Sequence, residues 1–159
     1  EGHLVVDMSS IAPGVSQRIG AGCKEKGINF LDAPVSGGEP FAISGELAIM
    51  VGGSADDFEQ AKPLFDILGK SAILCGKHGA GQVTKLANQI CVGANIHALA
   101  EALALAAKSG VNPETVYKAI QGGLAGSNVI NAKAPMMVDR NFEPGFSEDC
   151  SANEILPER

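Results

Sequence analysis

The feature that most restricts the fold of this chain is a helical pattern that runs from about residue 81 to residue 109 without a proline. The pattern is rich in alanine, and Gly110 provides the expected end. At ~1.5 Å per residue such a helix is roughly 40 Å long, which is more than one layer of a small domain needs. We therefore expect it to connect two parts of the chain as an interdomain helix.

Before this helix, apolar runs alternate with helical patterns, as in proteins that combine a sheet with helices. The predicted strands are residues 4–8, 28–35, 47–51 and 72–75, and the predicted helices are residues 13–26 and about 54–68. Short connections from strand to helix to strand favour a βαβ unit and a parallel sheet. Ser9 or Ser10 is expected to cap the first helix, and Pro63 is expected to kink or interrupt the second.

After the long helix the chain is predicted to be helical throughout. Asn112 and Pro113 start one helix, which Gly122 and Gly123 end, and a further helix runs from about residue 128 to residue 138. The predicted fold class is therefore α/β followed by all-α.

Composition excludes several classes of protein. The 159 residues are 45% hydrophobic and 19% charged, which is typical of a soluble protein with a packed core. The net charge of −6 and the lack of a Lys/Arg cluster argue against a nucleic-acid partner. No apolar run reaches the ~18 residues that a membrane span needs, and no signal-peptide pattern precedes the first strand. We expect a cytoplasmic protein without a membrane partner.

The cysteines and histidines form no disulfide or ligand pattern. The four cysteines are scattered without a Cys-x-x-Cys pair and are expected to be reduced thiols. Cys75 and His78 are close in sequence, but a zinc site needs about two more ligands, and none is suitably placed. We therefore expect no metal site.

Two segments carry polar groups in arrangements that suit chemistry. Lys85 follows the glycine-rich entry of the long helix, and the helical repeat places it on one face with Asn88 and Gln89. An ammonium beside amide groups can polarise a carbonyl or pass it a proton. An ordinary solvated helix lysine explains the same spacing.

The second segment, residues 36–38, follows the second predicted strand at its carboxyl end. The hydroxyl of Ser36 and the bare backbone N–H groups of Gly37 and Gly38 could hold a carboxylate, since ligands bind outside the carboxyl ends of strands in open α/β sheets. A plain turn explains this segment equally well.

Four segments taken together resemble the β-hydroxyacid dehydrogenase family, which contains 3-hydroxyisobutyrate dehydrogenase and tartronate semialdehyde reductase (2-hydroxy-3-oxopropionate reductase). The segments are Asp7-Met8-Ser9-Ser10, Asp32-Ala33-Pro34-Val35-Ser36-Gly37-Gly38, the Gly-x-Gly-x-x-x-Lys pattern from Gly79 to Lys85 with Asn88, and Gly122-Gly123-Leu124-Ala125-Gly126-Ser127. Their order matches the family up to about Phe146. The third and fourth look most like the tartronate semialdehyde reductase branch.

This resemblance implies an NAD- or NADP-dependent oxidoreductase that reduces a short oxo acid. Tartronate semialdehyde, which would give D-glycerate, is the first expectation, and the 3-hydroxyisobutyrate couple is the alternative. Lys85 would be the general acid and base, and Ser10 would lie near the nicotinamide. The implied substrate-binding residues are Ser36, Gly37, Gly38, Asn88, Gly123 and Ser127. Schiff-base chemistry at Lys85 is a remote alternative.

The chain also departs from the family. It lacks the Gly-x-Gly-x-x-Gly dinucleotide fingerprint after a first strand, and no lysine follows Lys133. We therefore expect a partial chain of 6-phosphogluconate dehydrogenase-like organisation. Residues 1–77 would be the C-terminal half of a Rossmann-like NAD(P)-binding domain, residues 78–146 the long helix with an incomplete all-α substrate and dimerisation domain, and residues 147–159 an atypical tail.

Two functional hypotheses remain open. The chain is either part of an active hydroxyacid dehydrogenase or a catalytically incompetent fragment that binds small acids or mediates oligomerisation. Half of a doubly wound sheet has an exposed strand edge, and such edges favour self-association. We therefore expect a homo-oligomer in either case.

Overall fold

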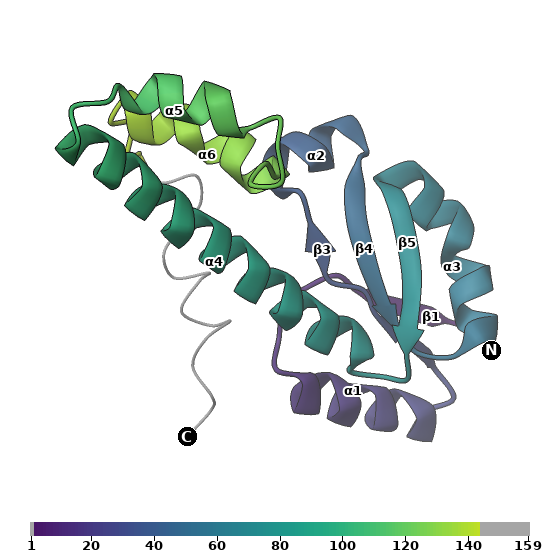
Figure 1. Cartoon of the computed structure of the whole chain (residues 1–159). Helices are drawn as coiled ribbons and strands as arrows, with labels where there is room; N and C mark the ends of the chain where they lie inside the picture. Colours follow the sequence, from purple (N-terminus) through teal and green to yellow (C-terminus); the bar gives the residue numbers. More distant parts are fainter. Residues whose placement is uncertain (1, 144–159) are drawn as a thin grey trace. The chain divides into compact units, whose positions relative to one another are not determined.

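The computed structural model describes residues 2–143, which form two compact units (Figure 1). The first unit reaches to Asn88, and the second begins at Gln89. This boundary lies inside α4 (Ala80–Lys108), so a single helix of 29 residues contributes to both units. The long helix predicted from the sequence is therefore confirmed to within about one residue at each end.

A mixed five-stranded sheet forms the centre of the first unit. Its strands are β1 (Leu4–Asp7), β2 (Asn29–Asp32), β3 (Val35–Ser36), β4 (Leu47–Gly52) and β5 (Gly69–Gly76). β1 is parallel to β2 and β4 is parallel to β5, but β2 and β3 both run antiparallel to β4. The expectation of a wholly parallel sheet is wrong, because only α1 and α3 provide the helical crossover that a parallel pair requires.

β2 and β3 follow one another along the same side of β4, and we call this pair of successive strands the lane beside β4. Asp32 pairs with Gly52 and Ser36 pairs with Ala48 in an unbroken antiparallel register. Between the two strands, the carbonyl of Pro34 accepts the Met50 N–H at 3.0 Å. Proline has no N–H to donate, so it takes part in the pairing with β4 only as an acceptor. The single strand predicted for residues 28–35 thus corresponds to one lane that the structure divides into two short strands.

The two longer helices that precede α4 were predicted from the sequence, but the N-cap of the first differs from the expectation. α1 (Pro13–Glu25) begins at an N-cap Ala12 without a side-chain hydrogen bond, so the expected capping by Ser9 or Ser10 is wrong. Both serines lie at least two residues too early in the chain to reach the first free N–H groups. α3 (Ala55–Leu68) is capped by Ser54, and it continues through Pro63 as one helix.

A short helix, α2 (Gly38–Ser44), was not predicted. Its seven residues give too few turns for an apolar period, and Pro40 and two flanking glycines look like loop signals. α2 fills the connection from β3 to β4 and thereby helps to reverse the direction of the chain.

The two faces of the sheet carry different residues because side chains alternate along a strand. The main core contains buried apolar residues of the sheet and of α3, namely Leu31, Ala33, Leu47, Ile49, Val51, Ala61 and Phe65. Phe30 and Asp32, which alternate with Leu31, are also buried, at 2% and 0% exposure. The buried carboxylate of Asp32 is the unusual group here, since Asp is rarely buried without partners.

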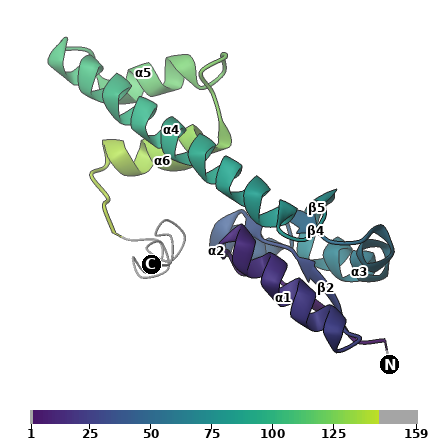
Figure 2. The ribbon, with the colours of Figure 1, turned by 90° about the horizontal axis from the view of Figure 1, so that it is seen from below.

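The second unit consists of the later part of α4 with α5 (Pro113–Ile120) and α6 (Asn128–Val138), which lie alongside that part of α4 in both views (Figures 1 and 2). Its small core contains Leu99, Leu103, Ile130 and Ala134. Both short helices agree with the sequence prediction, since Asn112 caps α5 and the bounds of α6 are those expected.

α4 is apolar as well as long. It contains an 18-residue window with a mean hydropathy of 1.6, of which 17% is buried. By length and composition alone it could cross a membrane, so the expectation that no segment would pass this test is wrong. One such helix is weak evidence for a membrane span, because core helices of soluble proteins pass the same test. The finding shows instead that much apolar surface of α4 lies exposed in this chain.

Candidate active site at the start of the long helix

The carboxylate of Asp32 holds the first turn of α4. One oxygen accepts the Gly79 N–H at 2.7 Å and the other accepts the Gln82 N–H at 3.1 Å. The first N–H groups of a helix have no partner within the helix, and a negative charge there is stabilised by the helix dipole. Asp32 therefore fixes the start of α4 at the carboxyl end of β2.

The Gly-x-Gly pattern at this point has a packing reason. A Cβ atom on Gly81 would lie 2.4 Å from the Met50 carbonyl oxygen and 2.8 Å from that of Asp32. Gly79 adopts a φ of 89°, which other residues rarely adopt. The two glycines let the first turn of α4 approach the backbone of β2 and β4 directly.

Gln82 ties α4 to the loop that follows β1. Its Oε1 accepts the Ile11 N–H at 3.0 Å, and its Nε2 donates to the Ser9 carbonyl at 2.7 Å. The side chain is 1% exposed. Ser10, the residue assigned to the cofactor from sequence, thus lies between two backbone groups that Gln82 holds.

His78 completes this support just before α4. Its Nε2 lies 2.9 Å from the Phe30 carbonyl, so Nε2 carries the proton and donates it. The imidazole also meets the Phe30 ring edge to face at 5.7 Å, and a Cβ on Gly20 of α1 would lie 2.7 Å from Nδ1. His78 therefore packs between β2 and α1.

Lys85 lies one turn beyond Gln82 on the same helix. It is half-buried, as are Asn88 and Gln89, whereas the apolar side chains nearby are more exposed. Val83 is 56% exposed and Ile90 is 74% exposed. This part of α4 therefore turns its polar face inward, which is the reverse of an ordinary surface helix. The arrangement differs from that of the solvated lysine considered above.

The segment of Ser36, Gly37 and Gly38 belongs to the same unit as Lys85. Ser36 ends the lane that starts with Asp32, and the two glycines turn the chain into α2 with φ values of 141° and 65°. A Cβ on Gly37 would lie 2.5 Å from the Phe41 side chain, so both conformation and space require glycine there. All three residues are at least partly accessible.

Comparison with known proteins identifies the group to which this chain belongs. Residues 1–79 match the family described as "NAD binding domain of 6-phosphogluconate dehydrogenase", and residues 79–154 match "NAD-binding of NADP-dependent 3-hydroxyisobutyrate dehydrogenase". The chain is 48% identical over 146 residues to 2-hydroxy-3-oxopropionate reductase of Escherichia coli (strain K12), an alignment that covers 92% of this chain and 50% of that protein. The chain belongs to the β-hydroxyacid dehydrogenase family.

Two further relatives agree with this assignment. The chain is 37% identical over 132 residues to 3-hydroxyisobutyrate dehydrogenase of Pseudomonas aeruginosa, covering 83% of this chain and 44% of that protein. The crystal structure of 3-hydroxyisobutyrate dehydrogenase from Salmonella typhimurium superposes with a TM-score of 0.84 at 31% identity, covering 95% of this chain and 53% of that one. The chain thus spans about half the length of the relatives it matches.

Proteins of the β-hydroxyacid dehydrogenase family bind NAD(P). The half-buried Ser10 and its anchored loop lie at the carboxyl end of β1, where a nicotinamide can be held. The helix that follows β1 starts with Ala12, Pro13 and Gly14, without the Gly-x-Gly-x-x-Gly spacing of a phosphate cradle.

Gly123 and Ser127 belong to the second unit. The Ser127 hydroxyl accepts the Ile130 N–H at 3.1 Å as the N-cap of α6, and it donates to Asn95 Oδ1 at 2.9 Å. Gly123 is exposed, and its N–H donates to the Ile120 carbonyl at 3.1 Å. Both residues make hydrogen bonds that stabilise their own unit, and their role in a substrate site stays a prediction.

The sequence prediction missed Asp32, Gln82 and His78 as supports of the site. All three interact with residues about 50 or more positions away, and nothing local signals such contacts. An Asp at the end of an apolar strand was the one available clue. Within residues 2–143, no three His, Cys, Asp or Glu side chains are grouped to hold a metal ion, and Cys23, Cys75 and Cys91 are free thiols.

Proposed function

We propose that this chain is part of an NAD(P)-dependent reductase that converts a short oxo acid into the hydroxy acid. The observation that carries the proposal is the fixed start of α4. Asp32 and Gln82 hold it against the carboxyl ends of β2 and β1, and the half-buried Lys85 follows one turn later. Such an arrangement supports a role for the Lys85 ammonium beside a nicotinamide and a carbonyl.

Each residue then has a definite task. Lys85 donates the proton that the substrate oxygen gains on reduction, and takes it back in the reverse reaction. Ser36, Gly37 and Gly38 hold the substrate carboxylate through a hydroxyl and two backbone N–H groups, and Asn88 orients the substrate. Ser10 contacts the nicotinamide end of NAD(P), which supplies the hydride when it is bound. The family resemblance adds Gly123 and Ser127 as candidate substrate-binding residues.

Tartronate semialdehyde is the substrate that we propose first, with D-glycerate as its product. The relative with 48% identity carries the name 2-hydroxy-3-oxopropionate reductase, which supports this choice. The relative with 37% identity is a 3-hydroxyisobutyrate dehydrogenase, so the 3-hydroxyisobutyrate couple is the alternative substrate.

The wider setting follows from the same proposal. Residues up to 77 would be the second half of a Rossmann-type domain, and the residues from 78 to about 146 the long helix and the beginning of a helical domain. Residue 1 and residues 144–159, which include the proposed tail, lie outside the described residues. The partners are a small oxo or hydroxy acid and further copies of the chain, without nucleic acid or membrane. The free thiols of Cys23, Cys75 and Cys91 support a cytoplasmic location.

Titration of NADH and NADPH into the purified chain, followed by nicotinamide fluorescence, tests the proposal together with a tartronate semialdehyde reduction assay. Lys85→Ala is expected to lower turnover by roughly 10²–10⁴-fold, as for other general acids. Lys108→Ala is the matched control, because Lys108 is an exposed lysine at the far end of the same helix. Turnover that survives Lys85→Ala would contradict the role of this lysine.

A second candidate function is a small-acid-binding or oligomerising module without catalysis. The absence of a glycine-rich phosphate cradle from the described residues favours it. The same titration separates the two candidates, since the module is expected to bind neither NADH nor NADPH.

A further inference from the structure

We propose that Gln82 is a positioning residue that sets the loop of residues 9–11 against the helix that carries Lys85. The inference rests on the proposed function for its consequence in catalysis. Its structural part stands on its own, because it concerns only contacts within the first unit.

The first argument is the way in which Gln82 is buried. A polar side chain that is 1% exposed costs free energy unless its donor and its acceptor both find partners. Gln82 satisfies both with main-chain groups of a single loop more than 70 residues earlier, the Ser9 carbonyl and the Ile11 N–H. Only a side chain with a donor and an acceptor side by side can serve this pair, which makes the amide specific for the loop conformation.

The second argument is the place of Gln82 on its helix. Its own N–H is held by Asp32 from β2, so the residue joins the ends of β1 and β2 at one point. Lys85 lies three positions later, on the same side of the helix by the helical repeat. Any displacement of the loop relative to α4 therefore changes the distance between Ser10 and the lysine.

The consequence for the proposed reaction follows from geometry. Hydride and proton must reach adjacent atoms of one carbonyl group, and a misplacement of about 1 Å can cost roughly 10²-fold in rate. Gln82 contacts neither reacting group in this scheme. It holds the loop of residues 9–11 in a fixed position relative to the helix that carries the proton donor, and its removal is expected to loosen that position without removing any catalytic group.

The test uses Gln82→Met, which keeps the length of the side chain and removes both hydrogen bonds. Gln82→Asn keeps the amide on a shorter arm that cannot span both partners, and serves if the methionine variant does not fold. Ser54→Ala is the control, because it removes an N-cap of α3 in the same unit at a cost of about 1 kcal/mol but lies outside the Gln82 contacts.

Amide hydrogen exchange of Ile11 is the first readout, and it needs no cofactor. Gln82→Met is expected to raise the exchange rate of Ile11 at least about tenfold relative to Ser54→Ala. Nicotinamide affinity is the second readout, and a loss of about tenfold is expected for Gln82→Met but not for Ser54→Ala. Where turnover is measurable, kcat is expected to fall in the Gln82 variant while KM for the oxo acid stays close to its original value.

The outcomes are separable. Unchanged exchange at Ile11 in the Gln82 variants overturns the inference, whether or not the chain binds nucleotide. Faster exchange with unchanged affinity in a chain that binds NADH also overturns it, since the loop would then not support the nicotinamide. Faster exchange in a chain that binds neither nucleotide supports the structural inference and contradicts the proposed function for this chain alone.

Discussion

At the scale of single residues, the site depends on groups that each serve two partners. The carboxylate of Asp32 accepts two N–H groups of α4, and the amide of Gln82 meets two groups of one loop. Gly81 must lack a side chain, because carbonyl groups of β2 and β4 occupy the space that a Cβ atom would need. Loss of one atom at any of these points therefore disturbs more than one element.

Gly81→Ala is expected to destabilise the first unit by about 1–3 kcal/mol, because the added methyl group meets backbone atoms that cannot easily move. Gly22→Ala is the matched control, since a Cβ there has no neighbour within 4 Å in α1. The control is expected to gain roughly 0.5–1 kcal/mol, because glycine is unfavourable inside a helix. Urea unfolding of both variants checks the opposite signs, and equal signs would contradict the packing described for Gly81.

Asp32→Asn is expected to cost about 1–3 kcal/mol of unfolding free energy. The amide of asparagine offers one acceptor where the carboxylate offers two, so one of the Gly79 and Gln82 N–H groups would face another donor. Asp66→Asn on the exposed face of α3 is the control, and it is expected to change stability by less than about 0.5 kcal/mol. Thermal unfolding of the pair measures the difference, and a neutral Asp32→Asn would show that the carboxylate does not hold α4.

The chemistry at this scale could be predicted only where it follows a local pattern. Lys85, Asn88 and Gln89 share a face because a helix repeats, whereas the finding that this face is the more buried one comes from the structure alone. The contacts of Gln82 with Ser9 and Ile11 join distant segments, and a single sequence carries no period that reports them.

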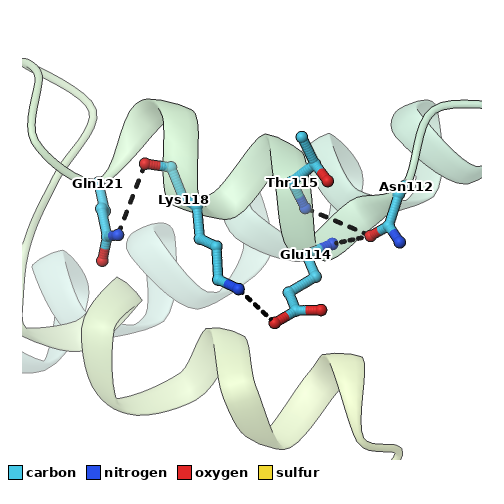
Figure 3. A network of polar contacts seen from close by, with 5 residues as sticks. All are labelled: Asn112, Glu114, Thr115, Lys118 and Gln121. Atoms are coloured by element: carbon cyan, nitrogen blue, oxygen red, sulfur yellow. Dashed lines mark hydrogen bonds and ion pairs between the residues drawn. The ribbon is translucent and has the colours of Figure 1, made fainter.

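At the scale of elements, caps and glycines define the helices well. Asn112 accepts the N–H groups of Glu114 and Thr115 at 2.8 and 3.3 Å, and Lys118 pairs with Glu114 at 2.7 Å one turn further on (Figure 3). Such signals are local, which explains why α5 and α6 could be predicted closely. The antiparallel pairing of β2 and β3 with β4 could not be predicted from local signals, because the direction of a strand depends on how the intervening chain folds back.

Asn112→Ala is expected to destabilise α5 by about 1 kcal/mol, since two N–H groups at its start lose their acceptor. Lys118→Ala removes only an exposed ion pair of the same helix and is expected to cost no more than about 0.5 kcal/mol. Amide exchange at Glu114 and Thr115 measures both variants. A larger effect of Lys118→Ala would mean that the ion pair, and not the cap, holds the start of α5.

At the scale of the whole molecule, the exposed apolar side chains of α4 point to further contacts. Ile90 is 74% exposed and Leu105 is 68% exposed on this helix, and β1 pairs only with β2 among the described residues. An exposed apolar helix surface and an exposed strand edge both favour association. We therefore propose that the chain is a dimer or a higher oligomer.

Static light scattering at micromolar concentration is expected to show an oligomer, and Ile90→Lys is expected to shift it toward the monomer. Burying a charge in an apolar interface is unfavourable, whereas the same charge on a monomer surface costs little. Ile67→Lys is the control, because Ile67 is 75% exposed on a different helix, α3. A monomer in the unmodified chain would contradict this proposal, as would an equal effect of both variants.

The continuous lane from Asp32 to Ser36 has a consequence for how members of this family can diverge. Asp32, Pro34 and Ser36 keep their places beside β4 because no residue is added or lost between them. One inserted residue would turn every later side chain to the opposite face of the sheet. Insertions and deletions are therefore expected to be excluded from residues 32–36, so that this segment changes by replacement of side chains and changes of length are confined to the loops beyond.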